Sequence, residues 1–274
     1  MKKALVALAL VVFTLLVLLP LLWVLWSSVK SGDRILAAPW ELPDPSQLQW
    51  KNYGAAWEKA GIGEAFFNSL VVTACSLVVL LPISAMAAYV LAKYPFRGSK
   101  LLQTVFMGQM MFPHFLVIVP LFFLLRDMRM LDTMSGLVAV YVAYSLSFTM
   151  FVLGGFFQAL PNELMEAAMI DGCSHSRTFW KVMLPLSKPG LVVVGIFVGI
   201  GLWNEYSLAL VLMPSSHNKT LPLGIANLTM TQQYQSDWGA LFAGLVIVML
   251  PVLVIYWFFK DKIHEAMLAG AIKG

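Results

Sequence analysis

Six long apolar stretches alternate with more polar segments along the chain. They cover residues 4–26, 66–92, 101–125, 137–157, 191–213 and 240–259, and each holds at least 20 residues. A helix needs about 20 apolar residues to cross a hydrocarbon core of roughly 30 Å, whereas a membrane barrel needs strands of alternating polarity. The stretches show no such alternation. The pattern therefore predicts an all-α, polytopic membrane protein in which residues 1–274 form one transmembrane domain with six transmembrane helices.

The charged residues avoid these stretches almost completely. Of 18 Lys and Arg and 14 Asp and Glu, only Glu205 lies inside one of them. The chain is 60% apolar and 12% charged, against about 45–50% and about 25% in soluble domains. This excludes a water-soluble globular protein. The net charge of +4 is ordinary for membrane loops, so we predict no nucleic-acid partner.

The basic residues of the loops predict the orientation. Six crossings place both termini on one side, and that side carries eleven Lys and Arg residues against seven on the other. Basic loops face the cytoplasm in bacterial inner-membrane proteins. We therefore expect a multi-pass protein of the bacterial cell (inner) membrane, surrounded by membrane lipid, with cytoplasmic N- and C-termini.

Several kinds of chemistry find no support in the sequence. Cys75 lies inside the second stretch and Cys173 in a loop, so neither a disulfide framework nor a zinc site is predicted. The phosphate-binding pattern Gly-x-x-x-x-Gly-Lys-Ser/Thr is absent. No cluster has metal-ligand spacing, and no nucleophile is paired with a base. We expect no catalytic residue, metal or cofactor, and any ATPase must be a separate polypeptide.

The segment 158–190 is the only sizeable loop on the predicted cytoplasmic side. Pro161 and Asn162 favour a helix start, and Gly172 supplies a stop where a left-handed residue is needed. Ser174 favours the start of a second short helix, which we expect to end before Leu184 and Pro185. The result is a helix-Gly-helix knuckle suited to docking in a groove of a partner, or an amphipathic segment lying on the bilayer surface.

The residues of this loop resemble a known family. Glu166-Ala167-Ala168, followed by Gly172 and then by Val182-x-Leu184-Pro185, is similar to the EAA loop of ABC importer permeases. Trp203-Asn204-Glu205-Tyr206 and the end Ala269–Gly274 also resemble the carbohydrate-uptake permeases of the maltose type. The resemblance implies a type I ABC importer permease fold.

The resemblance also implies a function and partners. The chain would be the non-catalytic permease subunit of an ATP-driven sugar importer, with a di- or oligosaccharide as substrate. It would form half of the translocation path beside a second permease subunit, in a heterodimer, with a dimeric ABC ATPase and an extracytoplasmic sugar-binding protein. Gly195-x-x-x-Gly199 is a candidate contact with the second permease. The residues expected to couple to the ATPase are Glu166, Ala167, Ala168, Asp171, Gly172, Leu184 and Pro185.

Glu205 is the one charge at membrane depth, where a charge costs about 3 kcal/mol or more, so it must face protein or water. His114 is the other titratable candidate at similar depth. We expect the two to approach each other or to line the translocation path with Asn204 and Trp203. Glu205 acting as a structural hydrogen-bonding group between helices is the alternative. A proton-coupled secondary sugar carrier that uses Glu205 and His114 as a relay is the alternative function.

Overall fold

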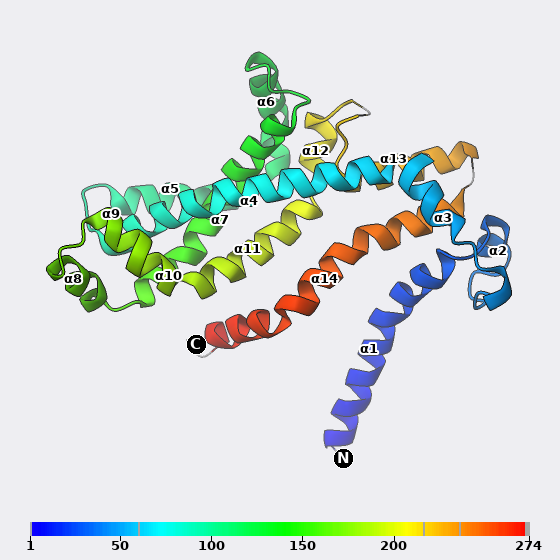
Figure 1. The fold of residues 1–274 in the computed structure, drawn as a ribbon, viewed down its shortest axis with the longest axis horizontal. Coiled ribbons are helices and arrows are strands. Elements are labelled where there is room, and N and C mark those ends of the chain that lie inside the picture. The colour runs from blue at the N-terminus through cyan, green and yellow to red at the C-terminus, as the bar shows by residue number, and fades with distance from the viewer. Residues whose placement is uncertain (1, 60, 216, 236, 272–274) are drawn as a thin grey trace. The chain divides into compact units, whose positions relative to one another are not determined.

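A computed structural model describes residues 2–59, 61–215, 217–235 and 237–271, and the side chains of all of these except 59, 114, 231–235 and 263–271. Every regular element in those ranges is helical (Figure 1). The chain divides into two compact units, one of Met1–Phe67 with Thr220–Leu253 and one of Asn68–Lys219 with Val254–Gly274. The helix α4 contributes residues to both units, as does α14.

The first unit holds the helices at the start of the chain and part of those at its end. Its elements are α1 (Lys2–Ser27), α2 (Gly32–Ala37), the 3-10 turn η1 (Pro45–Gln47), α3 (Lys51–Gly54), the π turn η2 (Ala55–Lys59), the first residues of α4 (Ile62–Lys93), α13 (Leu221–Gln235) and most of the first half of α14 (Trp238–Ala271).

Buried polar contacts fix the segment after α1. Lys30 is only 3% exposed, and its ammonium donates to the carbonyls of Ala38, at 2.7 Å, and Glu41, at 3.0 Å. Asn52 donates to the carbonyls of Ser28 and Lys30, both at 2.9 Å. Because buried carbonyls need donors, these two side chains give an irregular segment a defined path.

The second unit is organised around α7, which contacts both α5 and α11. Half of the residues in the most apolar 18-residue stretch of α7 are buried, and Tyr141, Leu153 and Phe157 are at most 1% exposed. The elements of this unit, besides the rest of α4 and the end of α14, are α5 (Ser99–Met111), α6 (His114–Asp127), α7 (Met134–Ala159), α8 (Asn162–Ile170), α9 (His175–Thr178), the π turn η3 (Phe179–Met183), α10 (Leu184–Leu186), α11 (Lys188–Trp203) and α12 (Ser207–Leu212).

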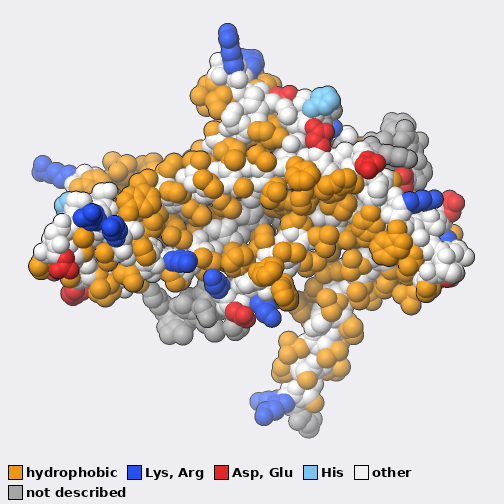
Figure 2. Space-filling model, in the orientation of Figure 1, with side chains coloured by type: hydrophobic (Ala, Val, Ile, Leu, Met, Phe, Trp, Pro, Cys, Tyr) orange, Lys and Arg blue, Asp and Glu red, His pale blue; other side chains and the backbone are white. Residues whose placement is uncertain are grey.

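Four helices, α1, α4, α7 and α14, are long and apolar enough to cross a membrane. Two further pairs reach that length only as bent spans. The first is α5 with α6, bent by 104°, and the second is the run His175–Leu186 with α11, bent by 72°. The described chain thus offers four to six spans. Exposed apolar side chains cover much of the face seen in Figure 2, which suits contact with lipid or with other membrane helices.

The third predicted stretch, residues 101–125, is therefore not one helix. Phe112 has extended backbone angles, φ −80° and ψ 122°, between α5 and α6. Pro113 explains this, because a proline disfavours helical angles in the residue before it and cannot donate a backbone hydrogen bond.

The glycine pair of α11 packs within the chain. A Cβ atom at Gly199 would lie 3.2 Å from Leu77, and one at Gly195 would lie 3.4 Å from Leu81, both on α4. The two glycines therefore allow α4 side chains to approach the α11 backbone. The expected contact of this pair with a second permease subunit is corrected to a contact inside the second unit.

Candidate functional site

Residues 161–187, which we call the knuckle, begin with α8 directly after the end of α7. Gly172 has a φ of 81°, the left-handed conformation predicted for it. The N–H of Gly172 donates to Met169 O and the N–H of Cys173 donates to Ala168 O, both at 3.0 Å. These two bonds form a Schellman motif, which satisfies the last carbonyls of a helix and turns the chain sharply. The Schellman motif at Gly172 therefore ends α8.

The second half of the knuckle differs from the short helix that the sequence predicted. Ser174 does cap α9, its hydroxyl accepting from the N–H of Arg177 at 3.4 Å. The helical path then continues through the π turn η3 into α10, which contains Leu184 and Pro185. The expectation that the helix ends before Leu184 is thus wrong. Pro185 is the second residue of α10 and follows the π turn η3 closely.

The knuckle presents several of the expected coupling residues to solvent. Glu166, Ala167, Asp171 and Gly172 are exposed, and Figure 1 shows α8 and α9 beside each other, away from α6 and α12 of the same unit. Ala168 is only 8% exposed. It packs inside the knuckle, so the exposed surface on α8 is made by its neighbours.

The exposed surface of α8 also carries apolar side chains. Ile170 is 86% exposed and Leu164 is 38% exposed, with the carboxylates of Glu166 and Asp171 close in sequence. An isoleucine this exposed on a short helix suits burial against a partner. Sequence reasoning missed Ile170; the available signal was an apolar residue directly before the acidic turn Asp171-Gly172.

Glu205 lies at a break in the fifth predicted stretch, residues 191–213. The helix α11 ends at Trp203 and α12 begins at Ser207. The Glu205 carboxylate accepts from the N–H of Leu208 at 2.7 Å and from the N–H of Ala209 at 3.1 Å. In a continuous helix these N–H groups would bond to the carbonyls four residues earlier. The Glu205 side chain therefore replaces backbone carbonyls as the acceptor for these two N–H groups, as polar side chains do at helix starts.

Glu205 also links α12 to the central helix α7. The hydroxyl of Tyr141 donates to Oε2 of Glu205 at 2.7 Å, the same oxygen that accepts from the N–H of Ala209. Negative charge at a helix N-terminus is favourable, and a carboxylate accepts several hydrogen bonds well. The geometry thus supports the structural alternative for Glu205. Sequence reasoning missed Tyr141, which lies 64 positions away.

The other candidate path residues occupy different environments. Asn204 is exposed and donates to Ile200 O at 2.8 Å, whereas Trp203 is 5% exposed. The side chain of His114 lies outside the described residues, and the expected approach of Glu205 to His114 stays a prediction.

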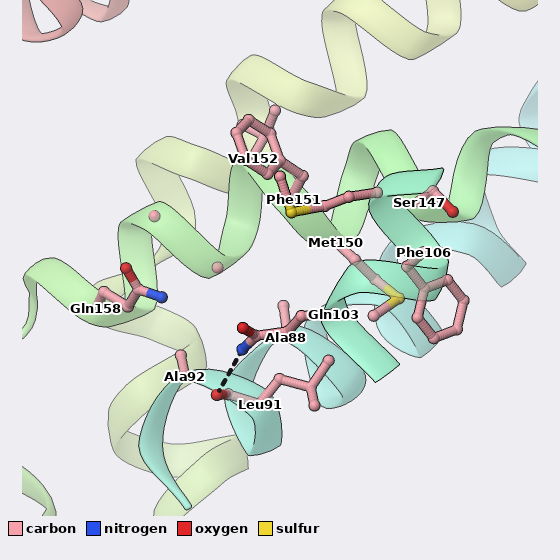
Figure 3. A pocket seen from close by; sticks show the side chains of 13 residues that line it. Ala88, Leu91, Ala92, Gln103, Phe106, Ser147, Met150, Phe151, Val152 and Gln158 are labelled. Atoms are coloured by element: carbon pink, nitrogen blue, oxygen red, sulfur yellow. Dashed lines mark hydrogen bonds between the residues drawn. The ribbon is translucent and has the colours of Figure 1, made fainter. Parts of the chain in front are cut away.

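Cavities in the described part of the second unit lie beside Glu205 and beside Gln103. One of about 370 Å³ is lined by Glu205, Tyr141, Gln109, Tyr144 and other residues of α5, α7, α11 and α12. The other, of about 500 Å³, lies between α4, α5 and α7 (Figure 3). Apolar side chains line most of it, and its polar side chains are Gln103, Ser147 and Gln158. The Gln103 amide donates to Leu91 O at 3.2 Å. These hollows are where the unit offers room for a ligand.

Residues 80–260 match the model of a protein family described as the binding-protein-dependent transport system inner membrane component. This range covers more than half of the chain and includes the knuckle and the break at Glu205. The chain belongs to this family.

Curated relatives are similar to the permease over nearly its whole length. The diacetylchitobiose uptake system permease protein NgcG of Streptomyces coelicolor is 42% identical over 264 residues, which are 96% of the permease and 87% of the relative. The trehalose transport system permease protein SugB of Mycobacterium tuberculosis is 33% identical over 263 residues, 94% and 93% of the two chains.

A solved structure shows the same fold. A chain from the crystal structure of a bacterial ABC transporter involved in the import of the acidic polysaccharide alginate superposes with a TM-score of 0.82 and 23% identity, covering 94% of the permease and 95% of that chain. The permease therefore has the fold of an ABC importer permease. Among its described residues no group of His, Cys, Asp or Glu has the arrangement of a metal site.

Proposed function

We propose that the permease is the non-catalytic transmembrane subunit of an ATP-driven importer for a di- or oligosaccharide. Its relatives are named for the uptake of diacetylchitobiose, of trehalose and, in Thermoanaerobacterium thermosulfurigenes, of starch degradation products. Diacetylchitobiose and trehalose each consist of two sugar units. The permease forms half of the translocation path, beside a second permease subunit in a heterodimer.

The exposed knuckle is the observation that carries this proposal. A helix of nine residues with a fixed stop, exposed acids and an exposed isoleucine suits the groove of a soluble partner. The partner we propose is a dimeric ABC ATPase, and an extracytoplasmic sugar-binding protein delivers the sugar. When the ATPase groove moves, the knuckle must move with it, and the covalently attached α7 and α11 follow. Both termini are cytoplasmic, and residues 1–274 act as one permease domain.

For the path itself we propose the surroundings of Glu205, with Asn204, Trp203 and His114 as further candidates. Three donors already converge on the Glu205 carboxylate. A proton relay would require this carboxylate to bind and release a proton. Protonation would remove acceptor capacity from the carboxylate and so disrupt these hydrogen bonds. The arrangement therefore favours ATP-driven transport over the proton-coupled carrier, and uptake should survive a protonophore as long as ATP is maintained.

The coupling assignment is tested by the double variant Glu166→Lys with Ala167→Phe, in the permease copurified with its ATPase. Both positions are exposed, so the knuckle itself stays folded, whereas a bulky residue at the buried Ala168 would damage it. We expect loss of ATPase copurification or of sugar uptake per ATP hydrolysed. The control is Glu58→Lys, an exposed acid outside the knuckle, which should leave copurification unchanged. Normal copurification and normal uptake in the double variant would refute the assignment.

A further inference from the structure

The end of α4 contacts both halves of the knuckle through two consecutive residues. The Lys93 ammonium donates to Leu160 O at 2.5 Å and to the side-chain oxygen of Asn162 at 2.8 Å. The hydroxyl of Tyr94 forms a hydrogen bond with Nδ1 of His175 at 2.9 Å. The partners of Lys93 lie at the entrance to α8, and His175 begins α9. One short piece of chain thus contacts the knuckle before and after its Gly172 turn.

Lys93 contacts the point at which α7 ends and the knuckle begins. Leu160 is the C-cap of α7, and Asn162 is the first residue of α8. Carbonyls at a helix C-terminus lack helical partners, and a cation is favourable there. By binding both groups, one ammonium joins the end of α7 to the start of α8.

An aromatic cluster extends the same contact along α4. The Tyr89 ring centroid lies 5.5 Å from that of Phe157 on α7 and 5.1 Å from that of Phe179 in η3. The hydroxyls of Tyr89 and Tyr94 are 3.3 Å apart, and the Tyr94 and His175 rings lie 5.5 Å apart. Phe157 and Phe179 are at most 5% exposed. The base of the knuckle therefore packs tightly against α4.

This contact matters because α4 is not covalently next to the knuckle. The chain connects the knuckle only to α7 and α11, so its movement reaches α4 only through side chains. We propose that Lys93 and Tyr94 are positioning residues that form a brace between α4 and the knuckle and transmit the movement of the knuckle to α4 during transport. The inference rests on the proposed function, since it assumes that the knuckle docks on an ATPase.

The proposed brace, with contacts before and after the Gly172 turn, leads to a specific prediction about coupling. Without it, α4 is linked to a displaced knuckle only through the aromatic cluster and through its packing on α7 and α11, so it should follow the knuckle less completely. ATP would then be hydrolysed with less sugar moved. The docking surface itself, on the exposed side of α8, does not include Lys93 or Tyr94, so assembly with the ATPase should persist.

The test uses the full complex of the permease, its partner permease, the ATPase and the binding protein in proteoliposomes. The measured quantity is sugar imported per ATP hydrolysed, for Lys93→Met, Tyr94→Phe, the double variant and Lys93→Arg. We expect the ratio to fall by about five-fold or more in the double variant, the size of a modest coupling free energy. The Lys93→Arg variant should keep most of the parent ratio of sugar imported per ATP hydrolysed, because a guanidinium can donate to both oxygens. Lys100→Met, an exposed lysine in the following segment, is the matched control and should match the parent.

The outcomes separate the brace from the proposed function. An unchanged ratio in the double variant would overturn the brace, as would a loss of assembled complex whose remaining molecules keep the parent ratio. If Lys93→Met fails to assemble, the conservative Tyr94→Phe variant decides by the same ratio. A parent complex without ATP-dependent uptake would instead overturn the proposed function.

Discussion

The Glu205 carboxylate takes part in three hydrogen bonds, and the one from Tyr141 can be removed without changing the shape of the core. Tyr141 is 1% exposed. Tyr141→Phe leaves the ring in place and removes one donor to a carboxylate, which should lower the free energy of unfolding by about 1.5–3 kcal/mol. Thermal or denaturant unfolding of the purified permease measures this. The control is Tyr256→Phe, at a residue that is 58% exposed, and it should change stability by less than about 0.5 kcal/mol.

Glu205→Gln separates charge from geometry at the same site. The amide replaces one acceptor oxygen by a donor, which would face a backbone N–H or the Tyr141 hydroxyl. We expect reduced stability together with reduced sugar uptake. Uptake and assembly at the parent level would show that the carboxylate has no charge-based role.

Lys30 supports the segment after α1 and gives a prediction about pH. Burial lowers the pKa of its ammonium below the ordinary 10.5. Between the lowered value and 10.5 the unfolded chain binds more protons than the folded one, so the free energy of unfolding should rise with pH through this alkaline window. Lys30→Met should lose this rise, and at neutral pH it should cost about 1–3 kcal/mol because two carbonyls lose their donor. Unfolding measured from neutral to alkaline pH tests both. An identical pH profile in the variant would contradict the prediction.

At the scale of elements, the turn at Gly172 decides the form of the knuckle. Gly172→Ala meets no atom within 4 Å, so its whole effect is the left-handed backbone, about 1–2 kcal/mol. We expect a weaker helix stop and less ATPase recovered on copurification. Gly108→Ala in α5 also meets no atom but sits in a helix, so it should stabilise by about 0.5–1 kcal/mol. Equal effects of the two variants would exclude a conformational role for Gly172.

Local signals explain how far the elements could be predicted. Helices run through the predicted stretches 4–26, 66–92, 137–157 and 240–259, because continuous apolar sequence favours them in any context. The break at Phe112 had a local signal in Pro113. The break at Glu205 had only its polarity, since the carboxylate replaces helix bonds by reaching two N–H groups ahead and Tyr141 on another helix.

At the scale of the whole molecule, the orientation in the membrane can be measured directly. In a permease with Cys75→Ser and Cys173→Ser, we expect Ser176→Cys in the knuckle to react with a membrane-impermeant maleimide only from the cytoplasmic side. Leu42→Cys, at a side chain that is 67% exposed in the segment after α1, should react only from the opposite side. The basic residues predict this asymmetry. Labelling of both sites from the same side would exclude the six-span topology.

The sequence by itself determined the class of protein and the place of the Gly172 turn in the knuckle. Apolar length, excluded charge and the spacing around Gly172 act over a few turns of chain, and their physical causes are hydrocarbon thickness and backbone sterics. Only the tertiary structure decided that Ala168 faces inward, that Glu205 accepts from the first N–H groups of α12, and that Lys93 and Tyr94 form hydrogen bonds with Asn162 and His175 of the knuckle. Each of these depends on groups that lie far apart along the chain or on packing around the residue, and a pattern of neighbours in sequence carries no information about either.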